Sequence, residues 1–250
     1  MREYYIGVDE AGRGPVIGPL IVCAISIPSD DYHILGDIGA RDSKTLSKTK
    51  RNTIYKLIHE EAIERNWNIG IVECEPSRID HNSSNSNLND LEVSLFSEAI
   101  KNTNDSNDSG SIFLDACDVN QDRFGNNVKS KLGPSWGDWR IISEHSMDSS
   151  NSLVAASSIV AKVTRDNAMQ KLSNDIGIDL GSGYPSDPKT ISSINVLISG
   201  KKPHDSLRWT WSTVIRAWEE MHGSPVPIRY ENKGISSQTS IQHWIEGNHK

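Results

Sequence analysis

A mixed α/β fold, in which helices flank both faces of a five-stranded sheet, is the fold class that the sequence predicts. Short apolar segments typical of strands alternate along the chain with longer segments that have helical spacing. The order is strand, strand, helix, strand, helix, strand, strand and then helices, which favours a layered α/β protein. Asp9 and Asp115 close two of the predicted strands, and sites in open α/β sheets collect at strand ends.

Five apolar segments are predicted as strands. They are residues 3–9, 19–27, 67–74, 112–114 and 139–142. The second, P-L-I-V-C-A-I-S-I, is rich in β-branched residues and almost wholly apolar, so we expect it to be buried on both faces. The fourth ends at Asp115, and the fifth leads into Glu144, His145 and Asp148.

Four segments are predicted as helices. They are residues 47–66, 90–100, 153–172 and 207–221, and polar loops are predicted at 82–89 and 102–110. Ser47 is a suitable N-cap for the first helix, and the apolar residues that follow recur at roughly helical spacing. The last helix carries Trp209, Trp211 and Trp218, which we expect to pack against the core.

The net charge of −7 counts against a general nucleic-acid binder, because such proteins are usually basic. A local basic strip could still hold a polyanion. The basic residues cluster enough to form one: Lys44, Lys48, Lys50, Arg51, Lys162, Arg165, Lys189, Lys201, Lys202 and Arg208.

Location and cysteine chemistry are constrained only coarsely. The chain has no apolar run of the roughly 20 residues that a membrane helix needs, and its N-terminus lacks a signal-peptide core. We therefore expect a cytoplasmic protein that does not contact a membrane. The three cysteines form no C-x-x-C pair, which argues against disulfides and a zinc site, and Cys23 and Cys74 are predicted to be buried thiols.

The start of the chain carries the clearest chemical signal. An apolar strand ends in two adjacent carboxylates, Asp9 and Glu10, and the glycine-rich turn Gly12-Arg13-Gly14 follows at once. Carboxylates suit hard divalent cations, and a glycine turn lets backbone N–H groups approach an anionic ligand. The pattern predicts metal-assisted chemistry on a phosphate, most simply in a nucleic acid.

Four acids stand at or just past the ends of apolar segments: Asp9, Glu10, Asp115 and Asp148. Two Mg²⁺ ions about 4 Å apart need several carboxylates and leave positions open for water and phosphate. A single acid at a strand end is more often a turn or helix-cap residue, so the prediction depends on the joint pattern.

Several segments in order resemble type 2 ribonuclease H, the ribonuclease HII family, and its archaeal members most. They are D-E-A-G-R-G-P-V-I-G-P (9–19), D-S-K-T-L-S (42–47), L-D-A-C-D-V-N (114–120), S-E-H-S-M-D (143–148), A-S-S-I-V-A-K-V-T-R-D (156–166) and G-S-G-Y-P-S-D-P (181–188). The matches extend over about residues 4–215. The chain departs from the family pattern at Ser146-Met147, where Lys-Ala usually stands.

The resemblance implies a ribonuclease H-like fold with a C-terminal helical extension and a metal-dependent endonuclease. It implies hydrolysis of the RNA strand of RNA–DNA hybrids and cleavage 5′ to ribonucleotides embedded in duplex DNA, which leaves 5′-phosphate and 3′-hydroxyl ends. Two Mg²⁺ or Mn²⁺ ions would activate the water and stabilise the leaving oxygen. The implied metal-binding catalytic residues are Asp9, Glu10, Asp115 and Asp148.

The resemblance also implies substrate contacts. The backbone of Gly12-Arg13-Gly14 would read the 2′-hydroxyl that separates RNA from DNA, and Tyr184 would pack against the sugar at the RNA–DNA junction. Basic side chains at Lys44, Lys162 and Arg165 would hold phosphates. A proton-transfer role for His145 is open, and a structural hydrogen bond is an equal alternative.

Two rival functions stay open. A DNA nuclease or resolvase of the same superfamily would keep the fold, but its DNA substrate has no 2′-hydroxyl for the glycine turn to read. A catalytically inactive nucleic-acid-binding module would not need all four acids.

A polar tail follows about residue 226. We predict a catalytic domain over residues 1–225 and a tail over residues 226–250, in a monomeric protein. Q-T-S-I-Q-H-W-I (238–245) resembles a sliding-clamp-binding peptide, to which Gln238, Ile241, Trp244 and Ile245 would contribute. An amphipathic tail that packs on the catalytic domain is an equal alternative.

Overall fold

The computed structural model describes residues 3–40, 46–103 and 109–229. They divide into two compact units, each built from three stretches of sequence. We call the described part of residues 1–11, 21–73 and 89–164 the sheet unit, and the described part of residues 12–20, 74–88 and 165–229 the helical unit. Each unit is described by itself below.

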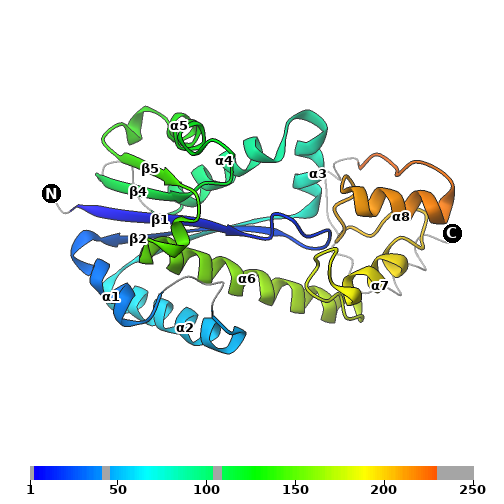
Figure 1. Cartoon of the computed structure of the whole chain (residues 1–250), viewed down its shortest axis with the longest axis horizontal. Coiled ribbons are helices and arrows are strands. Elements are labelled where there is room, and N and C mark those ends of the chain that lie inside the picture. Colours follow the sequence, from blue (N-terminus) through cyan, green and yellow to red (C-terminus); the bar gives the residue numbers. More distant parts are fainter. Residues whose placement is uncertain (1–2, 41–45, 104–108, 230–250) are drawn as a thin grey trace. The chain divides into compact units, whose positions relative to one another are not determined.

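A five-stranded sheet forms the centre of the sheet unit (Figure 1). Its strands are β1 (Tyr4–Ala11), β2 (Leu20–Pro28), β3 (Asn68–Cys74), β4 (Gly110–Asp115) and β5 (Arg140–Glu144). They stand in the order β3-β2-β1-β4-β5, with β1 antiparallel to β2 and parallel to β4, and with β4 parallel to β5. The predicted mixed sheet is therefore confirmed.

Helices cover both faces of this sheet, as the sequence predicts. Figure 1 shows α1 (Tyr32–Asp37), α2 (Lys48–Arg65) and the first part of α6 (Ser152–Ile176) on one face, and α4 (Leu88–Lys101) and α5 (Gln121–Leu132) on the other. The hydroxyl of Ser47 accepts a hydrogen bond from the N–H of Lys50, which confirms Ser47 as the N-cap of α2.

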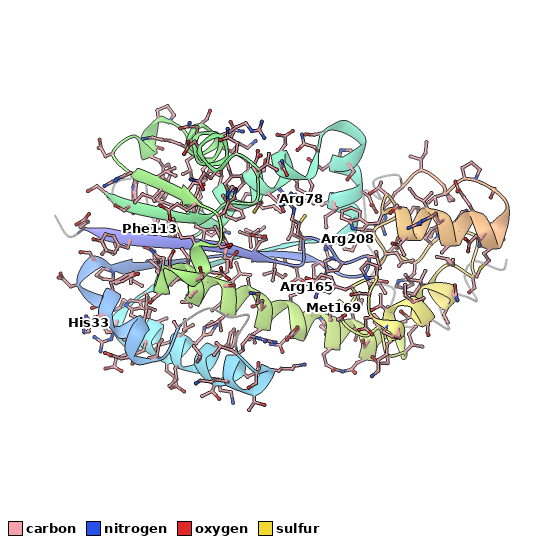
Figure 2. The ribbon with its side chains drawn as sticks, viewed as in Figure 1. His33, Arg78, Phe113, Arg165, Met169 and Arg208 are labelled. Carbon is pink, nitrogen blue, oxygen red and sulfur yellow. The ribbon has the colours of Figure 1, made fainter. Side chains whose placement is uncertain are left out.

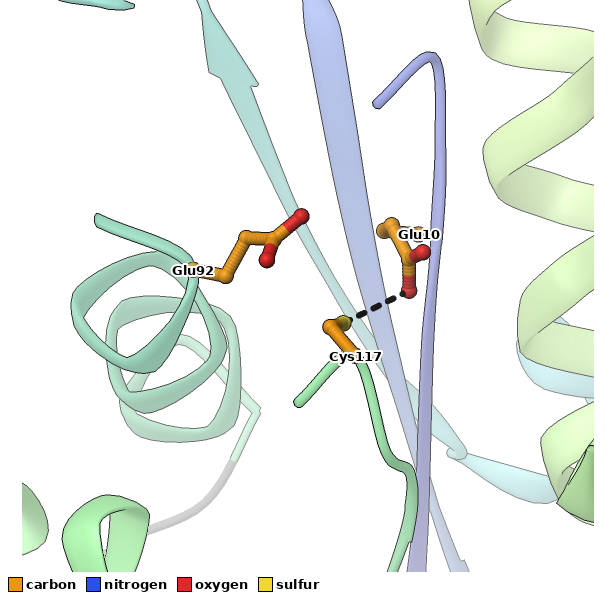
Figure 3. A group of neighbouring side chains, drawn as sticks. All are labelled: Glu10, Glu92 and Cys117. Atoms are coloured by element: carbon orange, nitrogen blue, oxygen red, sulfur yellow. Dashed lines mark hydrogen bonds between the residues drawn. The ribbon is translucent and has the colours of Figure 1, made fainter. Parts of the chain in front are cut away.

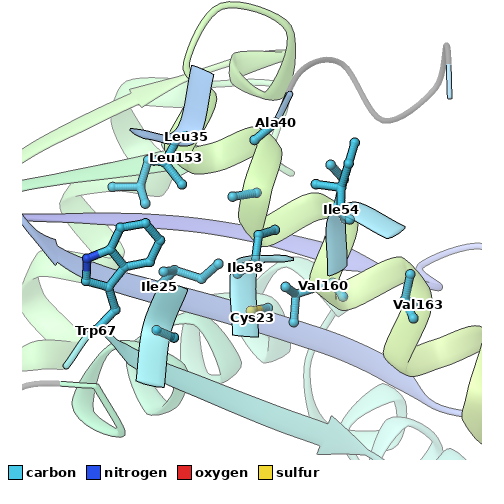
Figure 4. Packing of buried hydrophobic residues seen from close by; sticks show 14 of the residues in the cluster. Cys23, Ile25, Leu35, Ala40, Ile54, Ile58, Trp67, Leu153, Val160 and Val163 are labelled. Atoms are coloured by element: carbon cyan, nitrogen blue, oxygen red, sulfur yellow. The ribbon is translucent and has the colours of Figure 1, made fainter. Parts of the chain in front are cut away.

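The main core of the sheet unit lies between β2 and the helices α1, α2 and α6 (Figure 4). Alternate residues of β2, including Cys23 and Ile25, point into it, as the period of two along a strand requires. They meet Ile54 and Ile58 of α2 and Val160 of α6. The intervening residues of β2 are buried too, so the strand is covered on both faces.

Helix α6 lies tight against strand β1 at Gly7. A Cβ at this position would lie 2.7 Å from the carbonyl carbon of Leu153, and the hydroxyl of Ser157 donates a hydrogen bond to the Gly7 carbonyl at 2.8 Å. A residue without a side chain is therefore required where β1 passes under α6.

The helical unit contains α3 (Pro76–Asn85), the C-terminal part of α6, α7 (Pro188–Leu197) and α8 (Ser212–His222). Its own apolar core includes Ile17, Met169, Leu197, Trp209 and Trp218. The tryptophans at 209 and 218 are buried there and Trp211 packs against the cluster, which confirms the prediction that they belong to the core.

Several predicted boundaries are wrong. Strand β1 runs on to Ala11, so Asp9 and Glu10 lie within it and not after it. Most of the predicted loop at 82–89 is helical, since α3 ends only at Asn85 and α4 begins at Leu88. Pro76 at the first turn of α3 is a helix-start signal that the serine and asparagine content obscured.

The predicted helix at 207–221 begins later than expected, because α8 starts only at Ser212. The helices α1, α3, α5 and α7 were not predicted, since they are short or rich in polar residues. Cys23 and Cys74 are buried free thiols as predicted. Among the described residues, no helix combines the length and apolar character needed to span a bilayer.

Candidate active site

The parallel pairing of β1 and β4 brings two of the predicted acids together. Val8 stands opposite Leu114 in the register, so Asp9 and Asp115, the next residue on each strand, reach the same end of the sheet. Asp9 is 4% exposed, and its Oδ1 accepts a hydrogen bond from the N–H of Glu10 at 2.7 Å.

The third acid, Asp148, comes from a turn. Ser146 adopts a left-handed conformation (φ 55°), after which residues Met147–Ser149 form a single 3₁₀ turn. The N–H of Met147 donates a hydrogen bond of 3.0 Å to Oδ1 of Asp115, so this turn also orients the neighbouring acid. Because the donor is the backbone N–H of Met147, this contact does not depend on which side chain stands at position 147.

Asp9, Asp115 and Asp148 form a compact carboxylate group. One oxygen from each lies within 4.8 Å of the others, and Asp148 is only 2% exposed. Burial, with added repulsion from Glu10 and Asp115, raises the pKa of Asp9 well above its ordinary value. A divalent cation would relieve this repulsion, and carboxylate oxygens are the ligands that Mg²⁺ and Mn²⁺ prefer.

The carboxylate of Glu10 belongs to a different group (Figure 3). Because neighbouring residues of a strand point to opposite faces, Glu10 and Asp9 diverge. Glu10, Glu92 of α4 and Cys117 bring one ligand atom each within 4.8 Å of one another, and Sγ of Cys117 lies 3.3 Å from Oε2 of Glu10. Loss of hydration and repulsion from Glu92 raise the pKa of Glu10 to about 7.

Glu92 is the first of two site residues that the sequence reasoning missed. It is fully buried, on the face of α4 that also carries Leu95 and Phe96. Its spacing of three and four residues from those apolar positions was a usable signal, because a glutamate on the apolar face of a helix seldom lies there without a role.

A second missed residue is Ser158, which is fully buried in α6. Its side chain forms a hydrogen bond to Asp9 that lowers the pKa of this acid. Lys162, one turn further along α6, donates a hydrogen bond of 2.9 Å to the hydroxyl of Ser158. The lysine that the resemblance assigned to phosphate binding therefore stands next to a partner of Asp9.

The glycine turn and Tyr184 lie in the helical unit. Gly12 has φ +97°, a conformation that favours glycine. A Cβ added at Gly14 would lie 3.6 Å from Cε1 of Tyr184, so the turn and this ring are neighbours. The N–H of Val16 donates a hydrogen bond of 2.8 Å to the carbonyl of Gly183, which ties the two segments together.

Arg165 lies between these segments and is only 5% exposed. Its Nη2 donates hydrogen bonds to the carbonyls of Ile17 (3.3 Å) and Ser182 (3.1 Å), and its guanidinium carbon lies 5.4 Å from the centroid of the Tyr184 ring. These contacts hold the turn and the tyrosine, and the Tyr184 side chain keeps 39% of its surface exposed.

The side chain of His145 makes a structural contact. Its Nε2 lies 2.7 Å from the carbonyl oxygen of Asp118, while its main-chain N–H bonds to the side chain of Gln121. Lys44 and the predicted clamp-binding residues Gln238, Ile241, Trp244 and Ile245 lie outside the described residues.

A family model and curated relatives match this chain over most of its length. The model described as "Ribonuclease HII" matches residues 6–214. The ribonuclease HII of Methanococcus maripaludis (strain C6) is 38% identical over 222 residues, which cover 88% of this chain and 90% of the relative.

Solved structures of the same kind resemble the fold. The ribonuclease H2 from Pyrococcus horikoshii OT3 has a TM-score of 0.77 at 32% identity and covers 88% of this chain and 100% of its own. A chain of the PCNA:RNase HII complex from Archaeoglobus fulgidus has a TM-score of 0.71 at 28% identity, over 83% of this chain and 95% of that chain. This chain belongs to the ribonuclease HII family: it is a ribonuclease H, a metal-dependent endonuclease that acts on RNA–DNA hybrids.

Proposed function

We propose that this enzyme cuts the RNA strand of hybrids and also cuts on the 5′ side of ribonucleotides embedded in duplex DNA, by two-metal hydrolysis. The observation that carries the proposal is the convergence of Asp9, Asp115 and Asp148 within 4.8 Å, with Glu10 directly beside Asp9 in the chain. Such a donor set suits Mg²⁺ or Mn²⁺.

In this mechanism the four acids would hold the cations, which would supply activation of the attacking water and neutralisation of charge on the leaving 3′-oxygen. The protein's own groups hold the acids in place. The N–H of Glu10 holds Asp9, the N–H of Met147 holds Asp115, and the side chain of Ser158 forms a second hydrogen bond to Asp9. The products would carry 5′-phosphate and 3′-hydroxyl ends.

Substrate selection falls to the helical unit in this proposal. The N–H groups of the Gly12-Arg13-Gly14 turn would contact the 2′-hydroxyl, and Tyr184, which is exposed beside Gly14, would pack against the sugar. Phosphates would be held by Lys44 and Lys162. Arg165 is buried beside Tyr184, so its charge would attract phosphates from within the fold and not as an exposed side chain.

The test is cleavage of a DNA duplex that contains one ribonucleotide, by wild type and by Asp115→Asn, in Mg²⁺ and in Mn²⁺. We expect a single cut 5′ to the ribonucleotide by wild type, and a loss of at least about 100-fold in the variant, because it removes a cation ligand. Equal cutting of an all-DNA duplex would contradict the substrate assignment. Product ends that a polymerase cannot extend would contradict the proposed 3′-hydroxyl.

We further propose that the C-terminal tail, predicted over residues 226–250, binds a sliding clamp. The first residues of that stretch, Val226 and Arg229, pack against the helical unit, so the proposal concerns the residues that follow them. The support is the sequence at 238–245 and the PCNA complex formed by the relative from Archaeoglobus fulgidus. The test is a titration of the clamp against the full chain and against a Trp244→Ala, Ile245→Ala double variant. Equal affinity of the two proteins would contradict the tail assignment.

A further inference from the structure

A fully buried arginine supports the glycine turn of the helical unit. Arg208, labelled in Figure 2, was counted in the sequence among residues of a basic surface strip, yet its exposed fraction is 0%. All three of its guanidinium nitrogens donate hydrogen bonds to main-chain carbonyls. Nη2 bonds to Gly12 (2.6 Å) and Gly18 (3.1 Å), Nη1 bonds to Arg13 (2.9 Å), and Nε bonds to Gly18 (3.2 Å).

The main chain around Arg208 holds residues 16–18, the segment that follows the glycine turn. The N–H of Arg208 donates to the carbonyl of Val16 at 2.9 Å, and the N–H of Gly18 donates to the carbonyl of Ser206 at 2.9 Å. Ile17 and Leu207 form an isolated antiparallel bridge. These contacts hold residues 16–18, and the Arg208 side chain extends the support to residues 12 and 13.

The direction of these hydrogen bonds determines where the N–H groups of the turn point. The peptide bonds of the described residues are trans, and in a trans peptide the carbonyl of one residue and the N–H of the next point in opposite directions. The carbonyls of Gly12 and Arg13 point at the buried guanidinium. The N–H groups of Arg13 and Gly14 therefore face away from it.

Arg208 keeps its charge at neutral pH. Burial and the nearby Arg165 lower its pKa to about 10, which still leaves the guanidinium protonated. Its guanidinium carbon also lies 5.0 Å from the centroid of the Trp211 ring, in a cation–π contact. A buried charge is costly, and an apolar side chain would fill the same volume more favourably. The planar guanidinium can, however, hydrogen-bond several carbonyls at fixed angles, which an apolar side chain cannot do.

We propose that Arg208 is a positioning residue for ribonucleotide recognition. It sets the Gly12–Arg13 and Arg13–Gly14 peptide planes so that the N–H groups of Arg13 and Gly14 face the 2′-hydroxyl. Arg208 itself does not touch the substrate. The inference rests on the proposed function, because it takes the turn to be the element that reads the 2′-hydroxyl.

The first experiment compares Arg208→Lys with wild type on two duplexes, one with a single ribonucleotide and one with a 2′-fluoro nucleotide in its place. Lysine keeps the positive charge but has one nitrogen, so it cannot hold three carbonyls. We expect kcat/KM on the ribonucleotide duplex to fall by about 10- to 100-fold through misplaced donors. The slower cutting of the 2′-fluoro duplex should stay within about 2-fold, because it does not depend on those donors.

Arg229→Lys is the matched control. Arg229 is another arginine of the helical unit, and its side chain is 9% exposed. Its guanidinium carbon lies 4.5 Å from the centroid of the Trp209 ring, and its hydrogen bonds run to Asp80, Leu207 and Asp205. We expect this variant to keep the wild-type ratio between the two duplexes. An equal loss on both duplexes in Arg208→Lys would mean a merely structural role and would overturn the inference.

The outcomes separate this inference from the function on which it rests. A wild type that cuts both duplexes equally well would refute 2′-hydroxyl reading itself. A wild type that discriminates, together with an Arg208→Lys enzyme that discriminates equally, would overturn only the role of Arg208.

A second measurement does not depend on the variant being folded. In the Asp115→Asn background, which prevents cutting, the ribonucleotide duplex should shift the backbone amide NMR signals of Arg13 and Gly14. The Arg208 guanidinium signals should stay slow to exchange with water. Larger shifts at the Arg208 guanidinium than at those two amides would show direct substrate contact and would overturn the positioning role.

Discussion

The thiol of Cys117 donates a hydrogen bond to the carboxylate of Glu10, with Sγ and Oε2 3.3 Å apart. This contact lowers the pKa of Glu10, while loss of hydration and repulsion from Glu92 raise it, with a net result of about 7. Burial, followed by the nearby carboxylates, raises the pKa of Cys117 well above its ordinary value, so the thiol stays a hydrogen-bond donor at neutral pH. The charge of a proposed metal ligand is therefore adjusted by a neighbour that the mechanism does not otherwise use.

Removal of this donor should weaken cation binding at neutral pH. In Cys117→Ala the pKa of Glu10 rises further, and a cation must displace a more tightly held proton. We expect the Mg²⁺ concentration for half-maximal activity at pH 7 to increase by about 3- to 10-fold, with less difference above pH 8.5. Cys117→Ser keeps a donor and should stay near wild type. Identical Mg²⁺ curves for Cys117→Ala and wild type at every pH would contradict the role of this contact.

Stability in EDTA should fall as the pH rises from about 4.5 to 7. Glu10 has an ordinary pKa of 4.5 and a pKa of about 7 in the folded protein, so between these values the folded state keeps a proton that the unfolded chain has released. The stabilisation is complete below pH 4.5 and lost above pH 7. The shift corresponds to at most about 3 kcal/mol at pH 8.

Glu10→Gln isolates this effect, because other acids titrate equally in both proteins. The free energy of unfolding of wild type minus that of Glu10→Gln, measured by urea denaturation in EDTA, should decline across this pH range. A difference that rises with pH would contradict the raised pKa.

Gly12→Ala should destabilise the helical unit and impair cutting. The residue has φ +97°, and a Cβ would lie 2.8 Å from the carbonyl oxygen of Pro19 and against the Arg165 side chain. We expect a loss of about 2–4 kcal/mol in unfolding free energy, from backbone strain and steric overlap together. Gly177→Ala is the control, since its φ is +84° but a Cβ there would meet nothing within 4 Å. Equal losses in the two variants would show that strain alone is responsible.

Asp80→Ala should be among the most destabilising substitutions in the helical unit. Asp80 is 2% exposed and accepts hydrogen bonds from the N–H groups of Trp209 and Thr210 and from Nη1 of Arg229 at 2.8 Å. Its loss leaves a largely buried guanidinium without this carboxylate, at a cost of about 3–5 kcal/mol. The exposed pair of Asp179 and Lys189 offers a contrast, and Asp179→Ala should leave the urea midpoint unchanged within error.

The strands, and the position of acids at their ends, were predictable because both depend on local patterns. The β-branched run of β2 and the acids that close apolar segments require no long-range information. That Asp9 and Asp115 meet depends on the long-range pairing of β1 with β4, so it was expected only from the general tendency of sites to collect at strand ends and from the family resemblance. The position of Asp148 relative to Asp115 was not predictable in this way, because it depends on a left-handed Ser146 and a main-chain hydrogen bond from Met147. The side-chain direction of Glu10 would have followed from strand alternation if β1 had been extended to Ala11.

The buried arginine side chains were the least predictable feature of the structure. Arginine is usually an exposed residue, so the sequence placed Arg165 among phosphate-binding positions and both Arg165 and Arg208 in a basic strip. Their burial is decided by carbonyls far away in the sequence, those of Ile17 for Arg165 and of Gly12 for Arg208. No periodicity around either arginine carries that information.

The interleaved division of the chain affects how the protein can form during synthesis. The sheet unit draws on three stretches that end at residue 164, and the last described stretch of the helical unit is residues 165–229. On the ribosome, the sheet unit can complete itself while the helical unit still lacks its final helices. The glycine turn, made within the first twenty residues, must then wait for Arg208 to emerge from the exit tunnel, so a nascent chain stalled at residue 200 would carry all four acids without the guanidinium that supports the turn.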